Sequence, residues 1–174
     1  MLYPIPLLIT NYPSIYASIT KIIRPYHIFN SYGLFAVMTI SRSEIIIRGS
    51  DDRENWFPYE FKWKPGDVEK KPGFTAPHQP RLDWKMWFAA LSNYEKNLWL
   101  IQFMSRLLQG SPVVIALLEN NPFPNNPPKY VQAMVYDYRF ADSEIRNQDN
   151  SWWTRKLLSP YTPILQLPTS RGGN

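Results

Sequence analysis

The chain has 174 residues, of which 44% are hydrophobic, 16% aromatic and 19% charged. This apolar and aromatic content excludes an intrinsically disordered protein, and the length suits one globular domain. The absence of cysteine excludes disulfide scaffolds, thiolate zinc sites and thiol nucleophiles. The net charge of +5 favours anionic partners, but the cations are dispersed along the chain, so we expect no nucleic-acid binding.

Residues 1–24 are apolar and contain prolines. The best apolar run in this region, residues 5–9, is far shorter than the roughly 18–20 residues that cross a membrane. In residues 14–24, isoleucines recur at helical spacing and predict a short amphipathic helix. That helix either packs on the core or lies on a membrane surface.

Three stretches in the first half of the chain have strand patterns. Residues 32–40 are apolar on both alternating faces, as in a buried strand, and residues 44–49 are rich in β-branched side chains. Aromatic and polar side chains alternate over residues 57–64, which predicts one half-buried strand. The aromatic residues expected on its buried face are Phe57, Tyr59, Phe61 and Trp63. Pro58 cannot donate a ladder hydrogen bond, so we expect Pro58 to lie either on an edge strand or at the start of its strand.

A helical segment is predicted after the proline-rich stretch at residues 68–82. Asp83 is expected to cap the first helix, and large apolar residues follow at i, i+3, i+4 and i+7. These residues are Trp84, Trp87, Phe88 and Leu91. Met86 and Ala90 widen this apolar face beyond one stripe, which predicts that the helix is deeply buried.

Two further helices are predicted in the same segment. One begins near Asn97 and ends at Gly110, and its inward side chains are Leu100, Phe103, Met104 and Leu107. The other begins after Ser111, with Pro112 at its first position, and runs to about Glu119.

The remainder of the chain is predicted as an irregular segment, a strand, a loop and a helix. Prolines exclude regular structure at residues 121–128, and aromatic and charged residues alternate through the strand expected at residues 129–140. Residues 142–150 are interpreted as a polar loop, and residues 151–158 as a short helix.

The fold class predicted from this order is α+β, an antiparallel β-sandwich-like domain with an inserted helical segment over about residues 83–119. The chain has no βαβ alternation and no Gly-rich phosphate loop, which argues against a nucleotide-binding fold. The expected organisation is a lead-in at residues 1–24, a single domain at residues 25–168 and a flexible tail at residues 169–174.

No group of residues in the sequence predicts catalysis, and we expect no metal and no cofactor. His78 and Asp83 supply only two of the ligands that a metal site needs, and a hydrogen-bonded loop histidine is the simpler interpretation. The acidic run at residues 50–54 lacks the spacing of a calcium loop and is expected to be a solvated hairpin loop. A hydrolase built on Asp51, Asp52, His78 or Asp83 would need two of them within hydrogen-bonding reach in a cleft.

Four charged residues near aromatic sequence are candidates for structural ion pairs: Arg81, Asp83, Asp137 and Arg139. A partner-binding patch is the alternative interpretation of the same residues. Tryptophan residues left exposed on a sheet could instead stack on sugars. The candidates for that role are Trp56, Trp63, Trp99, Trp152 and Trp153.

One segment of the chain, residues 81–90, carries the strongest signal of a known family. Further matching segments are residues 32–35, 45–50, 58–67, 121–124, 127–128, 136–140 and 152–153. In these segments the chain resembles the C-terminal domain of the lipase maturation factor family, and the resemblance spans about residues 24–167. Some members of the family carry cysteines where this chain has Trp63 and Gly73, so the resemblance implies no redox role here.

The resemblance implies that this domain is one part of a polytopic membrane protein. Transmembrane helices would precede it, and residues 1–24 would be the remnant that joins membrane and domain and could contact the membrane surface. In eukaryotes such a domain faces the lumen of the endoplasmic reticulum, and a bacterial member would be attached to the cell membrane. The family assists the folding or assembly of secreted lipases of the lipoprotein lipase type, and its C-terminal domain is associated with engaging the client.

The resemblance and the absence of a catalytic group of residues lead to one main hypothesis, a non-enzymatic maturation or chaperone domain that acts by protein contact. The residues expected to bind the partner are His78, Arg81, Asp83, Trp84 and Trp87. The alternative is a β-sandwich module that binds a glycan or a lipid headgroup.

Overall fold

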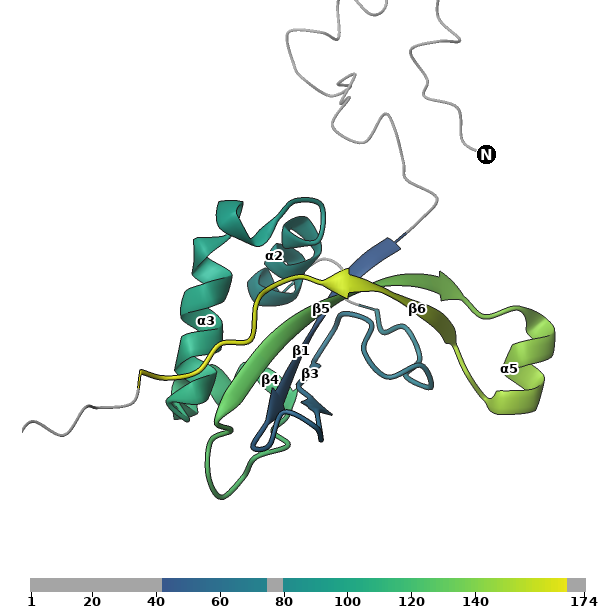
Figure 1. Cartoon of the computed structure of the whole chain (residues 1–174). Coiled ribbons are helices and arrows are strands. Elements are labelled where there is room, and N and C mark those ends of the chain that lie inside the picture. Colours follow the sequence, from purple (N-terminus) through teal and green to yellow (C-terminus); the bar gives the residue numbers. More distant parts are fainter. Residues whose placement is uncertain (1–41, 75–79, 169–174) are drawn as a thin grey trace, which may run out of the picture. The chain divides into compact units, whose positions relative to one another are not determined.

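The computed structural model describes residues 42–74 and 80–168, and Figure 1 shows their arrangement. The helix predicted over residues 14–24, the strand predicted over residues 32–40 and His78 lie outside the described residues. Within the described ranges, no helix is both long enough and apolar enough to span a membrane.

Four antiparallel strands form the main sheet in the order β2-β1-β5-β6. Its centre consists of β1 (Arg42–Ser50) and β5 (Tyr130–Phe140), and every residue of β1 has a partner in β5. The sequence predicts both strands near these bounds, because β-branched or alternating aromatic residues mark them. At one edge β6 (Trp153–Pro160) pairs with β5, and at the other β2 (Phe57–Pro58) pairs with the end of β1.

The prediction of one strand over residues 57–64 is wrong, because the chain changes sheets within it. After β2, the backbone N–H of Tyr59 donates to the carbonyl oxygen of Ile47 at 2.9 Å. The chain then continues as β3 (Glu60–Phe61), which pairs with β4 (Leu118–Asn120) in a separate two-stranded sheet. The edge position expected for Pro58 is confirmed, because β2 is an edge strand.

This change of sheets also changes which aromatic side chains are buried. Tyr59 and Phe61 enter the core as expected, whereas Phe57 and Trp63 are about half exposed. The alternation therefore predicts only the middle of this segment correctly.

The helical segment contains α2 (Arg81–Ala89), the 3-10 turn η3 (Tyr94–Lys96), α3 (Leu98–Leu108) and α4 (Pro112–Ile115). The α3 prediction is confirmed, and its C-terminal stop is Gly110, whose φ of 65° favours glycine. Pro112 is the first residue of α4 as expected, but α4 ends well before residue 119 because β4 begins at Leu118.

The predicted loop at residues 142–150 and the predicted helix at residues 151–158 are both wrong. Residues 142–150 contain a helix, α5 (Ser143–Asp149), which ends at Asn150 in the left-handed conformation, with a φ of 53°. Residues 151–158 lie largely in β6 and form no helix. Trp153 explains this difference: it is buried at the start of β6, stacked on Phe140 with ring centroids 4.5 Å apart. Beyond it, most β6 side chains are exposed, so they show no apolar alternation typical of a strand.

The α+β class is confirmed, but the sandwich is not. Helices α2 and α3 pack against β1 and β5 respectively, so helices cover one face of the main sheet (Figure 1). The largest core cluster lies between these elements. Its fully buried members include Ile45, Ile47, Met86, Leu100, Met104, Leu107, Val131 and Ala133.

The segment after β3 covers the other face of the sheet. There a small cluster of Ile46, Tyr138 and Trp153 is buried, and the Tyr138 hydroxyl donates to the carbonyl oxygen of Gly66. The same face holds an ion pair that the sequence does not predict, between Lys64 Nζ and Glu44 Oε2 at 3.3 Å. Both side chains are almost completely buried, so this pair fixes the segment to β1.

Candidate functional site

Helix α2 turns its aromatic side away from the core. Trp84 and Phe88 are each 43% exposed, and Leu91 just beyond the helix is 56% exposed. The residues that α2 buries are Asp83, Met86 and Ala89. The prediction of a deeply buried tryptophan helix is therefore wrong: the helix exists, but its other face meets the sheet.

The carboxylate of Asp83 explains why this other face is buried. Asp83 Oδ1 accepts the backbone N–H groups of Trp63 and Lys64, each at 3.0 Å, and the side chain is 5% exposed. Asp83 does not cap the helix, because the helix begins at Arg81 with Pro80 at the N-cap position. With Asp83 turned inward, the residues three and six positions later also face inward, and the bulky aromatic residues cannot.

The exposed aromatic residues contact one another. Ring centroids lie 5.4 Å apart for Trp84 and Phe88 and 5.0 Å apart for Trp87 and Phe88, and both pairs are inclined rather than parallel. These distances fall within the favourable range for aromatic pairs. We call Trp84, Trp87, Phe88 and Leu91 the aromatic face; within it Trp87 is half-buried and the other three are exposed.

A pocket of about 470 Å³ lies at the N-terminal end of α2. It combines three cationic side chains with tryptophan and aliphatic surface, and we call it the basic pocket. Its lining is Lys62, Trp63, Pro80, Arg81, Leu82, Asp83, Lys85, Trp99 and Leu117.

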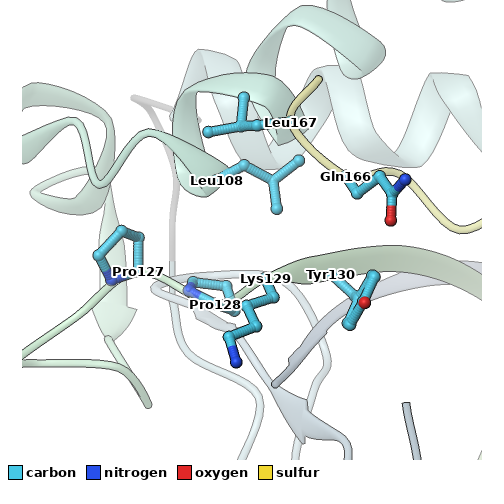
Figure 2. Close-up of a pocket in the computed structure, with 7 residues that line it drawn as sticks. All are labelled: Leu108, Pro127, Pro128, Lys129, Tyr130, Gln166 and Leu167. Carbon is cyan, nitrogen blue, oxygen red and sulfur yellow. The ribbon is translucent and has the colours of Figure 1, made fainter. Parts of the chain in front are cut away.

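A second pocket of about 370 Å³ lies between the C-terminal segment and the residues that lead into β5, as Figure 2 shows. Gln166 and Leu167 lie on one side of it, with Leu108 of α3 nearby and the start of β5 opposite. Arg53 stacks on Tyr130 at 4.2 Å and donates to Gln166 Oε1 at 3.2 Å, which fixes the C-terminal segment beside this pocket. The only charged residue in the lining is Lys129.

The four candidates for structural ion pairs divide into two groups. Asp137 and Arg139 pair at 3.1 Å, but Arg139 is 71% exposed, so this pair contributes little to stability. Arg81 and Asp83 do not pair, because Asp83 binds backbone N–H groups and faces inward, whereas Arg81 is exposed.

The acidic loop after β1 has a structural role. Asp52 accepts backbone N–H groups from Glu54 and Asn55 and a side-chain N–H from Asn55. The bonds from Asn55 and Glu54 hold the pKa of Asp52 well below its usual value, so this carboxylate stays ionised and shapes the loop. Asp51 accepts the backbone N–H of Lys129 at 3.1 Å. In the described part of the chain, no group of three or more metal-binding side chains converges.

Most of the tryptophans considered for sugar stacking are already covered. Arg48, Lys85 and Arg146 lie over the rings of Trp56, Trp99 and Trp152 at 4.5–4.6 Å, and Trp153 is buried. Trp63 is the most exposed of these candidates, and it lines the basic pocket.

The fold and the site define a small α+β domain with an aromatic helix face exposed beside a basic pocket. The profile of the lipase maturation factor C-terminal domain matches residues 28–163, most of the chain. The chain therefore belongs to the lipase maturation factor family. The resemblance found in the sequence is confirmed.

Known relatives agree with this assignment. Lipase maturation factor 2 of Xenopus laevis is 44% identical over 149 residues, which cover 82% of this chain and 21% of the relative. Lipase maturation factor 1 of Bos taurus is 39% identical over 156 residues, which cover 85% of this chain and 28% of the relative. The chain thus spans about a quarter of the length of these relatives. No solved structure matches it significantly.

Proposed function

We propose that this chain forms the client-binding domain of a lipase maturation factor. In this proposal it contacts a secreted lipase during folding or assembly, acts as a chaperone by protein contact and catalyses no reaction. The domain would work beside a membrane-spanning region of the same protein, on the lumenal side of the endoplasmic reticulum membrane in a eukaryote or at the cell membrane in a bacterium. Membership of the family supports the role in lipase maturation.

The observation that carries the proposal is the aromatic face. Trp84, Phe88 and Leu91 remain exposed although α2 packs on the sheet, so their apolar surface contributes little to the core of this domain. Clustered exposed apolar residues mark protein-interaction surfaces, and aromatic residues supply most of the energetic anchors in such surfaces. An incompletely folded lipase exposes apolar segments that could pack against this face.

The test is capture of a newly synthesised secreted lipase, co-expressed with the chain and recovered by its affinity tag. We expect the double variant Trp84→Ser, Phe88→Ser to capture at least about thirtyfold less lipase, because the loss of even one aromatic anchor that contributes about 2 kcal/mol weakens binding about thirtyfold. The matched control is Leu157→Ser, Leu158→Ser, which removes two apolar side chains of similar exposure, 49% and 52%, from β6.

Circular dichroism and a thermal melt establish that each variant is folded. Equal capture by the folded α2 variant and the wild type would contradict the proposal, as would equal losses in the α2 and β6 variants.

A further inference from the structure

We propose that the basic pocket binds one carboxylate group of the client. The ligand is an extended apolar segment with a glutamate or aspartate, whose carboxylate binds in the basic pocket while neighbouring apolar side chains pack on the aromatic face. This inference rests on the proposed function and names the chemistry of the segment that the surface selects.

Two of the three cations of the pocket are held in place, and none of the three is neutralised by a carboxylate within the described residues. Lys62 Nζ donates to the carbonyl oxygen of Ala116 at 2.8 Å, which holds this ammonium at the pocket. Its other N–H groups remain able to donate to a ligand. Lys85 Nζ lies 4.6 Å from the centre of the Trp99 ring, so a cation–π contact orients it. Arg81 is exposed and, within the described residues, pairs with no carboxylate.

The negative charge in the pocket does not balance its three cations. Its lining contains one carboxylate, Asp83, which is buried and binds two backbone N–H groups. Glu119 lies on β4, the strand that follows Leu117, but it pairs with Lys70. The pocket therefore presents a local excess of positive charge, which is complementary to a carboxylate.

The apolar wall of the pocket favours a carboxylate that is carried on an apolar segment. Trp63 and Leu117 are each 47% exposed, and both line the pocket. A free inorganic anion would gain no binding free energy from these apolar side chains, whereas an apolar segment would bury them and bind more tightly. The volume of about 470 Å³ also falls within the range of about 300–1,000 Å³ that is usual for ligand pockets.

The spacing along α2 favours a polypeptide as the occupant. Arg81 and Phe88 are seven positions apart on the helix, which corresponds to about 10 Å at a rise of about 1.5 Å per residue. An extended chain covers that distance in about three residues. A segment with an acidic residue about three positions from an aromatic or aliphatic residue can therefore contact both the basic pocket and the aromatic face.

The test uses two fluorescently labelled twelve-residue peptides that differ at one position. Both contain Trp and Leu, and three residues before the Trp one has Glu and the other Gln. We expect the Glu peptide to bind the chain at least about fivefold more tightly and to lose affinity as salt is raised. Arg81→Gln and Lys85→Gln should each reduce binding of the Glu peptide severalfold and leave binding of the Gln peptide unchanged. The matched control is Arg139→Gln, which removes an exposed cation from β5 and should change neither affinity.

Three results would overturn the inference. The first is equal affinity for the two peptides, and the second is equal loss of affinity in the pocket variants and in Arg139→Gln. The third is that phosphatidylserine vesicles bind in a way that depends on Arg81 and Lys85 while the Glu peptide does not compete, because the occupant is then a lipid surface. Each of these results leaves the lipase-capture test unaffected, so failure of this inference is distinguishable from failure of the proposed function.

Discussion

Helices α2 and α3 are neighbours in the chain and both pack on the main sheet, yet only α3 buries its bulkiest apolar face. α3 buries five large apolar side chains, which are Leu100, Phe103, Met104, Leu107 and Leu108. α2 buries a carboxylate, a methionine and an alanine, and leaves Trp84 and Phe88 exposed. The difference shows that the most hydrophobic side of a helix need not be the side that faces the core.

The cause of the difference is local. In α3 a single apolar stripe coincides with the only face that can pack, so periodicity predicts its orientation. In α2 two faces compete, and the hydrogen bonds from the backbone of residues 63 and 64 to Asp83 select the less bulky one. The buried side chains at this contact, Asp83, Met86 and Ala89, are all smaller than tryptophan, so the helix lies closer to the sheet than buried tryptophans would allow.

The largest expected effect is a difference in stability between the two helices. Leu107→Ala should lower the free energy of unfolding by about 3 kcal/mol, because Leu107 is 1% exposed and its removal leaves a cavity. Phe88→Ala removes a larger side chain but should cost less than about 1 kcal/mol, because Phe88 faces solvent. Urea unfolding curves measure both values. A larger loss for Phe88→Ala than for Leu107→Ala would mean that α2 packs through its aromatic face.

The next largest effect concerns Asp83, the residue that sets the orientation of α2. Asp83→Ala should lower the free energy of unfolding by about 2 kcal/mol, because two backbone N–H groups lose their acceptor in a buried site. Asp83→Asn keeps one oxygen acceptor, so its loss should be clearly smaller than that of Asp83→Ala. Equal stability of Asp83→Ala and the wild type in urea unfolding would show that these bonds do not select the buried face.

The smallest effect concerns the junction of the two helices and depends on pH. The Tyr161 hydroxyl donates to the carbonyl oxygen of Ala89 at the end of α2 and accepts from Asn97 Nδ2 at the start of α3. Burial raises the pKa of Tyr161, and burial raises the pKa of Tyr138 to about 12. Unfolded tyrosine has a pKa of about 10, so above that pH the unfolded state loses its protons first and stability falls as pH rises towards about 12.

Tyr161→Phe should therefore have two consequences. The free energy of unfolding at about pH 7 should fall by about 1 kcal/mol, because the bond to Ala89 is lost. The decline in stability above about pH 10 should become shallower, because one tyrosine proton no longer differs between the folded and unfolded states. Urea midpoints measured from about pH 8 to 12 test both, and an unchanged slope would contradict the burial of this hydroxyl.

The fold could be predicted from the sequence wherever the apolar pattern of a segment was compatible with only one secondary structure and one buried face. β1, β5 and α3 each have a single apolar pattern, and the structure confirms all three. The end of the chain could not be predicted in the same way, because the residues of β6 after Trp153 are mostly exposed and show no alternation of burial. Tertiary pairing with β5 determines that segment, and no local signal does.

The candidate site could be predicted in part. Arg81, Trp84 and Trp87 were expected to bind a partner because of the family resemblance, while the periodicity of α2 predicted a buried helix. These two expectations conflict for Trp84, and in the structure its side chain is exposed. Lys62, Lys85 and Trp99 were missed as pocket residues, because they come from separate elements that only the tertiary fold brings together.

The central claim is that the aromatic face of α2 is where a client lipase makes contact. The most direct test is a photo-crosslinking amino acid placed at Phe88 in one variant and at Leu157 in another, two exposed positions on different elements. Each variant is co-expressed with a secreted lipase and irradiated while the lipase is being synthesised. We predict a covalent adduct with the lipase from position 88 and none above background from position 157. Equal adducts from both positions, or an adduct from position 157 alone, would contradict this claim.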